Sequence, residues 1–592
     1  MLAISLLLIT LGIFGLRGVI SNVYFAELLG SQYVFLFLRV SYWVCILAGA
    51  VLLVLWVRRE RPMLLHALGE LRRNRFYLLA LALAAAPFFY IVITKRLGLD
   101  FWLDELISIR RHIVTSLSSA LFWYPVPNNH VFTNALSGIY LKLINAKELL
   151  TVLQTPALLR AFYLAFGLGT LVIGALTAYR FLGRVAAFIM VVLFGTTIAY
   201  LNFVVQVRGY SPSIFFAAGL QLAILTYLEQ GKRASALAVL ALSAMLLYSI
   251  PSNLYFLLAL FVYFLVWGIY EWSIIKGDCR TAFAAHDFQG LNRPLTLGLA
   301  LALGCALAVI AYLPILDKIL ENRYVETLGA FQGSAFPGLL IESAKVFISG
   351  RAWLFALAAV GIAILFIDKH SEHRRQRLPI IYFLAASLVL PFLFSAVRGD
   401  EPFVRSFFVL MPTFFLLAAI GLQALFERIP RETRKSRALA IGALLALAIY
   451  ANTVFFSTYA QIASSVAETL ANEDVSQVEI LDTRLGASVF LDHYHLNELI
   501  EGFRRQANSG VPVLIDRANT RYVFTLSVYF EAYGINYEEF EQPEEIQGQD
   551  TYIFLSYPHK ALSEWQVIYP DLNCKNVSAV LTIYQVLYCQ FE

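Results

Sequence analysis

Long apolar segments recur along almost all of this 592-residue chain, and they limit what it can fold into. An α-helix needs about 20 apolar residues to cross the hydrocarbon core of a bilayer. The composition agrees, because 59% of the residues are hydrophobic and only 14% are charged, whereas soluble domains carry roughly 25% charged residues. The chain is therefore predicted to be an α-helical polytopic membrane protein with about 13 transmembrane helices. The segments lie near 1–16, 33–57, 76–96, 157–178, 185–205, 210–228, 236–252, 253–272, 295–315, 352–367, 378–396, 408–426 and 438–458.

The charged loops between these segments predict the orientation of the chain. Six basic loops share one side of the membrane with the N-terminus; they are 58–75, 179–184, 229–233, 276–280, 368–377 and 427–437. Lys and Arg are enriched in cytoplasmic loops, so we expect a multi-pass protein with a cytoplasmic N-terminus. The basic residues are thereby explained by membrane topology, and no nucleic-acid partner is expected. The first segment lacks a basic start and a small-residue cleavage site, so we interpret it as a membrane helix and not as a secretory signal.

The external side receives a large first loop, at about 97–156, and the tail 459–592. The tail contains 19 Asp and Glu against 7 Lys and Arg, a net charge of −12, whereas the rest of the chain is basic. We expect two domains, a transmembrane domain at 1–458 and an external α/β domain at 459–592. Cys574 and Cys589 both lie in the external tail, where oxidation is permitted, and are a candidate disulfide pair. The residue pattern of the tail predicts strands at 478–483, 511–516, 551–556 and 579–589, and an amphipathic helix at 488–505.

Two adjacent carboxylates, Asp104 and Glu105, stand in the stretch FWLDELISIRRH (101–112), at the edge of an apolar segment. A carboxylate there can accept a proton from an incoming hydroxyl group, or it can hold a divalent cation. The alternative is that both residues only begin an interfacial helix, where acidic side chains suit the positive end of the helix dipole. The spacing alone favours this structural interpretation. Other polar residues on the same external face shift the balance toward catalysis.

These further polar residues are candidates for substrate binding, and they are Asn129, His130, Arg160, Arg208, Tyr210 and Arg405. The asparagine-rich stretch that contains Asn129 could bind a sugar, or it could instead order the external loop. Each arginine alone would suit a lipid-headgroup anchor. Several arginines beside two carboxylates indicate instead a pocket for a lipid that carries phosphate or pyrophosphate. His130 alone is more typical of a structural loop histidine. Asp104, Glu105 and His130 are metal-ligand residue types without a diagnostic spacing. A divalent metal (Mg²⁺, Mn²⁺ or Zn²⁺) is therefore a candidate cofactor, with Glu105 and His130 as its candidate ligands.

Five short motifs occur in an order, and with a common external placement, that resembles the GT-C class of polytopic glycosyltransferases. The relatives in question are the bacterial branch related to protein O-mannosyltransferases and aminoarabinose transferases. The motifs are WLDE (102–105), NNHVFTNAL (128–136), LLRAFYLAFG (158–167), QVRGYS (206–211) and VRSFFVLMPTFFLLAAIGL (404–422). The stretch VPNNH departs from the proline-rich element that many relatives carry at this place, which leaves the role of His130 open.

This resemblance implies an inverting glycosyltransferase in the bacterial inner membrane, with its C-terminal domain outside. The donor would be a polyprenyl-phosphate sugar and the acceptor a hydroxyl group on a lipid, glycan or protein at the external face. Asp104 would act as the general base, Glu105 would support it or bind a metal, and Arg208 would face the donor phosphate. Two alternatives stay open: a transporter or flippase of lipid-linked saccharides, and a polymerase or ligase of surface polysaccharide, which the basic loop 316–351 would suit.

Overall fold

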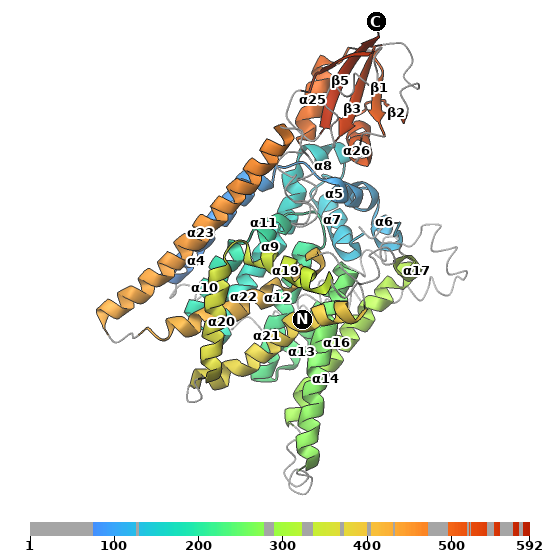
Figure 1. Ribbon diagram of the computed structural model, residues 1–592. Coiled ribbons are helices and arrows are strands. Elements are labelled where there is room, and N and C mark those ends of the chain that lie inside the picture. The colour runs from blue at the N-terminus through green and yellow to red at the C-terminus, as the bar shows by residue number, and fades with distance from the viewer. Residues whose placement is uncertain are drawn as a thin grey trace, which may run out of the picture.

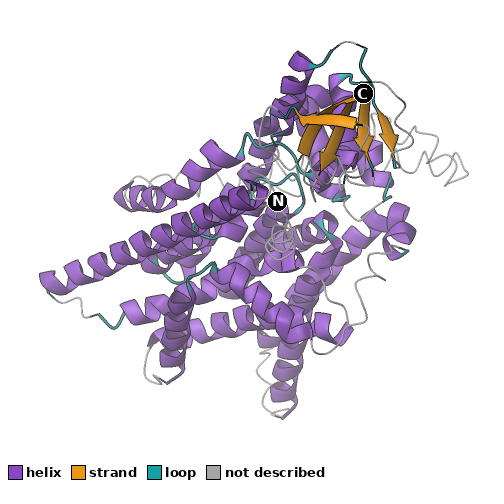
Figure 2. Ribbon diagram, turned by 45° about the horizontal axis from the view of Figure 1, so that its top comes forward, coloured by secondary structure: helices purple, strands orange, loops and turns teal. Residues whose placement is uncertain are grey.

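The structure is a computed structural model, and its elements group into a large helical part with a small sheet domain at one end (Figure 2). It describes residues 75–125, 129–277, 289–321, 335–367, 372–398, 404–429, 433–471, 495–508, 510–517, 520, 523–541, 550–556, 572–578 and 584–591. The fold class predicted from the sequence, a helical membrane protein with a C-terminal α/β domain, is confirmed.

Most helices of the helical part are long and apolar, and Figure 1 shows them packed side by side. They are α4 (Arg75–Ile91), α9 (Pro156–Phe181), α10 (Arg184–Gly195), α11 (Ile198–Phe203), α12 (Tyr210–Gln230), α13 (Arg233–Ser249), α14 (Leu254–Gly277), α16 (Gln289–Tyr312), α17 (Leu316–Leu320), α19 (Ala335–Ile348), α20 (Ala352–Ile367), α21 (Glu372–Arg398), α22 (Met411–Phe426) and α23 (Arg434–Ala471). Between α4 and α9 lies the segment that the sequence predicts to be the first external loop, the name kept for it below. It folds into α5 (Leu103–Ser108), α6 (Leu117–Phe122), α7 (Val131–Leu143) and α8 (Leu149–Gln154).

Among the described residues, eight helices are long and apolar enough to cross a membrane. A ninth span results if the helices Gly338–Ile348 and Ala352–Ile367, which meet at a bend of 100°, count as one. The eight helices coincide with eight of the segments predicted from the sequence, and the bent pair accounts for the segment at 352–367.

Four of the thirteen predicted segments differ from this pattern. The segments at 185–205 and 236–252 overlap the apolar helices Arg184–Gly195 and Arg233–Ser249, which have 12 and 17 residues and are shorter than the eight candidate spans. The segments at 1–16 and 33–57 lie outside the described residues. The count of thirteen spans therefore stays a prediction.

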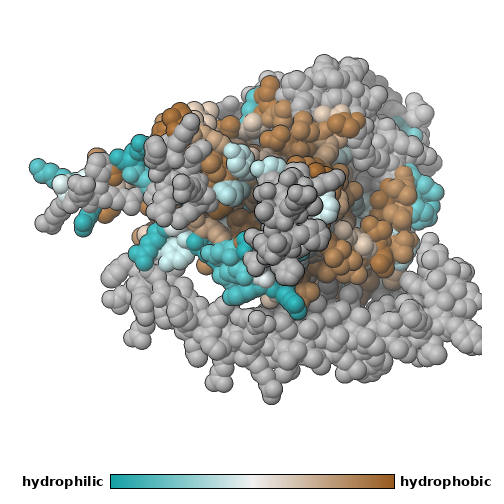
Figure 3. All heavy atoms as spheres, turned by 90° about the horizontal axis from the view of Figure 1, so that it is seen from below, coloured by the Kyte–Doolittle hydropathy of each residue, from teal (hydrophilic) through white to brown (hydrophobic). Residues whose placement is uncertain are grey.

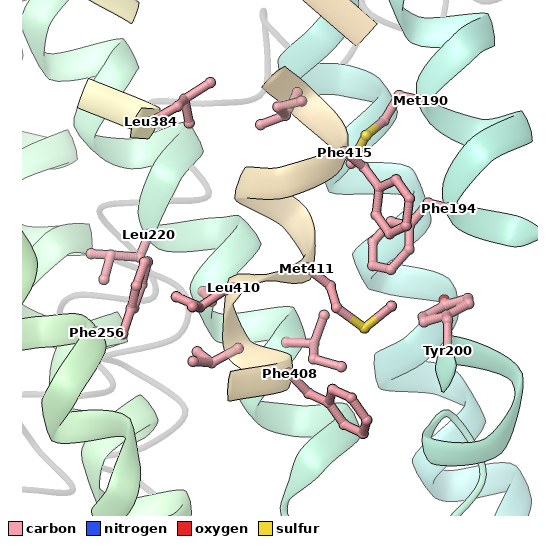
Figure 4. Packing of buried hydrophobic residues seen from close by; sticks show 14 of the residues in the cluster. Met190, Phe194, Tyr200, Leu220, Phe256, Leu384, Phe408, Leu410, Met411 and Phe415 are labelled. Carbon is pink, nitrogen blue, oxygen red and sulfur yellow. The ribbon is translucent and has the colours of Figure 1, made fainter. Parts of the chain in front are cut away.

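The helices are held together by apolar side chains and by a close backbone crossing of α20 and α22. Figure 4 shows Phe194 of α10 beside Phe415 of α22, and their ring centroids are 5.1 Å apart. Where α20 crosses α22, a Cβ atom added to Gly421 would lie only 2.0 Å from the carbonyl oxygen of Ala358. Apolar residues also cover much of the described surface in Figure 3, as expected for a surface that faces lipid.

The C-terminal domain contains a mixed five-stranded sheet with two helices, α25 (Leu496–Gln506) and α26 (Val523–Tyr533). The strand order is β2 (Glu538–Phe540), β1 (Val513–Asp516), β3 (Thr551–Ser556), β5 (Tyr584–Phe591) and β4 (Leu572–Asn576). β1 pairs in parallel with β2 and β3, whereas β5 is antiparallel to β3 and β4. Cys574 and Cys589 are opposite each other in this last pair and form a disulfide.

The predicted elements of the tail correspond to β1, β3, β5 and α25, and the strand predicted at 478–483 lies outside the described residues. β2, β4 and α26 were not anticipated. In addition, α23 continues to Ala471, past the domain boundary expected at 458.

The sheet domain packs directly on the first external loop, and this contact positions the site (Figure 1). One cluster of buried apolar residues contains Phe101 and Leu106 from the loop together with Leu499, Phe503 and Phe530 from α25 and α26. The loop is therefore held between the membrane helices and the external domain.

Candidate active site

The two adjacent carboxylates lie in the first turn of α5, a short helix that begins directly after the extended residue Trp102. The side chain of Glu105 accepts a hydrogen bond from the backbone N–H of Trp102 (3.2 Å), which closes the N-terminus of the helix in the manner of a capping box. Acidic residues also suit the positive end of the helix dipole. Successive helical side chains are about 100° apart, so Asp104 and Glu105 have different surroundings.

Glu105 is completely buried and forms an ion pair with Arg160, at the start of α9. Oε1 accepts from Nη1 of Arg160 (3.1 Å) and from the backbone N–H of Val207 (2.8 Å). Oε2 accepts from Nη2 of Arg160 (2.9 Å) and from Trp102 N–H. Burial raises the pKa of Glu105, and the four donors oppose that rise. All four partners are donors, so the carboxylate is ionised here and its acceptor capacity is used up.

Arg160 is equally saturated. Besides its two bonds to Glu105, it donates from Nε to the carbonyl oxygen of Leu99 (3.3 Å), from Nη1 to that of Val205 (3.4 Å) and from Nη2 to that of Asp100 (3.0 Å). A guanidinium group has five N–H bonds, and each of them is engaged. Arg160 was expected to contact substrate. In the structure all its N–H groups bind the protein, where they join α9 to the segment 99–105 and to Val205, so none is left for a substrate.

Arg208 is the cation beside Asp104. Its Nη1 donates to a carboxylate oxygen of Asp104, and its Nε donates to Nε2 of His130 at 3.2 Å. The guanidinium group lies over the rings of Trp102 and Tyr210, 5.7 and 5.2 Å from their centroids. The side chain of Arg208 is 3% exposed, whereas that of Asp104 is 15% exposed and Glu105 is fully covered. Asp104 is therefore the carboxylate that a substrate can reach.

His130 is buried at the N-terminus of α7, and its environment keeps it neutral. Burial lowers its pKa well below the usual value, and the cations Arg208 and Arg405 lower it further. Neutral Nε2 acts as an acceptor for Arg208. Arg405 is half-buried in the 3₁₀ turn Val404–Leu410. The sequence predictions for Asp104, Arg208, His130, Tyr210 and Arg405 thus converge on one region.

The side chain of Asn129 is bound within its own loop and not to the residues around Asp104 and Arg208. Its side-chain amide donates to the carbonyl oxygens of Ala120 (2.9 Å) and Trp123 (2.8 Å), and its Oδ1 accepts from Asn134 (3.0 Å). These bonds fasten the loop that follows α6. Asn129 was expected to bind substrate, and in this structure it orders the first external loop, which was the other interpretation of the asparagine-rich stretch.

The proposed metal ligands do not fit a metal site. Both oxygens of Glu105 are occupied by donors, and Nε2 of His130 accepts from Arg208. A divalent cation bound to Nε2 of His130 would lie next to the guanidinium group of Arg208, and the two positive charges would repel each other. Within the part of the chain that the structure describes, there is also no group of three or more His, Cys, Asp or Glu that could hold a metal ion.

The sequence did not foresee the ring of Trp102 or the backbone groups that bind Glu105 and Arg160, among them the N–H of Val207 and the carbonyl group of Asp100. Trp102 stands inside the WLDE motif, so it could have been named. The backbone groups carry no signal in the residue pattern, because almost any residue type could supply them.

Comparison with known proteins gives structural neighbours only, since no family model and no curated protein matches the chain. ArnT from Cupriavidus metallidurans in the apo state has a TM-score of 0.49 at 12% identity, over 88% of this chain and 98% of ArnT. The same protein bound to undecaprenyl phosphate has a TM-score of 0.49 at 13% identity, over 87% and 98% of the two chains. The oligosaccharyltransferase of Archaeoglobus fulgidus has a TM-score of 0.41 at 12% identity, over 81% and 69%. At such identities and TM-scores, the function of this chain must be argued from its own residues.

Proposed function

We propose that this protein is a membrane glycosyltransferase that transfers a sugar from a polyprenyl-phosphate donor to a hydroxyl group of an acceptor. The observation that carries the proposal is the Asp104–Arg208 pair. It combines a reachable carboxylate with a buried guanidinium group at the edge of apolar helices. Such a pair meets both needs of the reaction, since the acceptor must lose a proton and the leaving phosphate must be stabilised.

In this mechanism Asp104 takes the proton of the acceptor hydroxyl group, while the oxygen of that hydroxyl group forms a bond to the anomeric carbon of the sugar. The bond between that carbon and the phosphate oxygen breaks, and its electron pair stays on the polyprenyl phosphate. Attack from the face opposite the phosphate inverts the anomeric configuration. Arg208 and Arg405 bind the phosphate, and the aromatic rings of Trp102 and Tyr210 keep Arg208 in place.

Glu105 and Arg160 have a different role, since both are saturated and buried. They fix α5, the start of α9 and the segment before Arg208 relative to one another. The proposal therefore uses one of the two adjacent carboxylates as a base and the other as a structural ion, and it routes no step through a metal. It also places the site on the external face of a bacterial inner membrane, opposite the six basic loops.

The test is transfer of radiolabelled sugar from a panel of polyprenyl-phosphate sugars by the purified protein in lipid vesicles. We expect wild type to use at least one donor and Asp104→Asn to lose about two or more orders of magnitude in rate, as for removal of a general base. Asp317→Asn is the matched control, because Asp317 is an external carboxylate with a side chain that is 61% exposed. Equal rates for wild type and Asp104→Asn would refute the role of Asp104. Movement of a lipid-linked sugar across the vesicle membrane without transfer would favour a transporter.

A further inference from the structure

Asn497, in the first turn of α25, joins the external domain to the scaffold of the site. Its backbone N–H donates to Oδ2 of Asp100 (2.9 Å), and its Nδ2 donates to Oδ1 of the same carboxylate (2.5 Å). Nδ2 also donates to the carbonyl oxygen of Leu153 (2.7 Å), and Oδ1 accepts from the hydroxyl group of Tyr533 (2.8 Å). The side chain of Asn497 is therefore held on every side.

Asp100 connects this contact to the ion pair below the site. It is 7% exposed, and its own carbonyl oxygen accepts from Nη2 of Arg160. Arg160 in turn holds Glu105, and Glu105 holds the N–H of Val207, which directly precedes Arg208. From Asp100 to Val207 every link is a buried hydrogen bond with a carboxylate, a guanidinium group or a peptide group as partner, and the two bonds of Asn497 to Asp100 are part-buried. Such bonds restrict local motion more than exposed ones do.

We propose that Asn497 of the external domain is a positioning residue for the Asp104–Arg208 centre. This rests on the proposed function for the identity of the centre. Asn497 fixes the carboxylate of Asp100, and Asp100 fixes the extended segment that leads into α5. The external domain is thus a part of the active-site scaffold, although it supplies no group to the reacting atoms.

The same interface offers a control that separates positioning from simple docking. Arg110 and Glu531 join the loop to α26 through two hydrogen bonds of 2.8 Å, and their side chains are 38% and 52% exposed. This pair belongs to the same contact between loop and domain, but it has no bond to Asp100 or Arg160. Glu531→Gln therefore weakens the interface without touching the polar chain that leads to the site.

The first measurement is hydrogen exchange, read by mass spectrometry, on peptides that cover residues 99–108. In Asn497→Ala the backbone N–H to Asp100 and the apolar interface are kept, but the side-chain bonds are lost. We expect the protected amides of this segment to exchange about ten-fold faster or more, as for loss of a hydrogen bond to a buried charged group. Glu531→Gln should leave their exchange within about two-fold of wild type. This readout does not depend on any transferase activity.

The second measurement is the transfer rate with the donor that wild type uses. Asn497→Ala should lower kcat about 10- to 100-fold, since small displacements of reacting groups cost this much, with the donor KM within about two-fold of wild type. Asn497→Asp, which faces Asp100 with a second carboxylate, should be worse. Asp100→Asn combined with Asn497→Asp restores an amide–carboxylate pair and should recover part of kcat.

Unchanged exchange and unchanged kcat in Asn497→Ala would overturn the proposal, and so would equal losses in Asn497→Ala and Glu531→Gln. A lower yield of folded protein with wild-type kcat per molecule would also overturn it, because the role would then be only structural. Faster exchange in Asn497→Ala, with no transfer by wild type on any donor, would support the link to the loop and refute the proposed function instead.

Discussion

Replacing Glu105 with Gln is the most informative single change, because it keeps the size of the side chain and removes its charge. Each oxygen of Glu105 accepts one bond from Arg160 and one from a backbone N–H. The amide NH₂ group of Gln must replace one of these oxygens, so in either orientation it faces two donors and two bonds are lost. Arg160 also stays buried without a counter-charge. Breaking a buried ion pair in this way costs about 3–5 kcal/mol, so we expect the free energy of unfolding to fall by that amount.

The assay is denaturant unfolding of purified variants in detergent micelles, followed by tryptophan fluorescence. Asp104→Asn is the matched control at the neighbouring position, and it should change the free energy of unfolding by about 1–2 kcal/mol at most, because Asn keeps an oxygen for Arg208 and the site is partly open. A further variant, Glu105→Gln with Arg160→Met, should cost less than the sum of the two single changes. The reasoning is refuted if Glu105→Gln is as stable as wild type, or if the two single changes simply add.

Three further predictions concern the rest of the molecule. A methyl group on Gly421 would meet backbone atoms of α20, so Gly421→Ala should cost about 1–3 kcal/mol of unfolding free energy, whereas Gly442→Ala, with open space in α23, should not destabilise. Burial lowers the pKa of His112 to about 4, so between pH 6.5 and 4 the unfolded chain binds a proton that the folded chain does not. The free energy of unfolding should therefore fall by up to about 3 kcal/mol as the pH falls through this window. His112→Asn should remove this pH dependence, which unfolding curves recorded at several pH values would measure. Loss of the disulfide in Cys574→Ser opens a loop with a sequence separation of 15 and should destabilise the external domain by about 3 kcal/mol, which melting with and without reductant would measure.

The sequence predicted the membrane fold well because apolar length is a local property. A segment such as 210–228 carries its own evidence, and the structure has a helix at Tyr210–Gln230. The segment at 185–205 shows the limit of this reasoning, since the apolar run contains the break between α10 and α11, which no hydropathy average detects. In the external domain, β3 was predictable from four consecutive strand-forming residues, Thr551 to Phe554, whereas β2 has only three residues and little signal.

The site was harder to predict because the role of each site residue depends on partners far along the chain. Asp104 and Glu105 are neighbours with the same chemistry, and their residue types and spacing give no reason to separate a base from a structural ion; only the family resemblance suggested different roles. The separation comes from Arg160 and Arg208, which lie on different elements and each select one carboxylate. For Asn129, the sequence left binding and loop ordering open, and its three bonds within the loop decide for the latter.

The bonds that build the scaffold also differ widely in how much chain they enclose. The ion pair of Glu105 with Arg160 spans 55 residues, the bond to Val207 spans 102, and the contact of Asp100 with Asn497 spans 397. A ribosome delivers the chain from its N-terminus, so the first two closures become available when little more than a third of the protein has been made. The last one must wait until all the described membrane helices have been synthesised, because Asn497 follows α23, the last of them. Synthesis therefore sets an order of assembly, in which the Glu105–Arg160 ion pair can form before the contact of Asp100 with Asn497. A nascent chain truncated before the external domain would carry the buried ion pair without that contact.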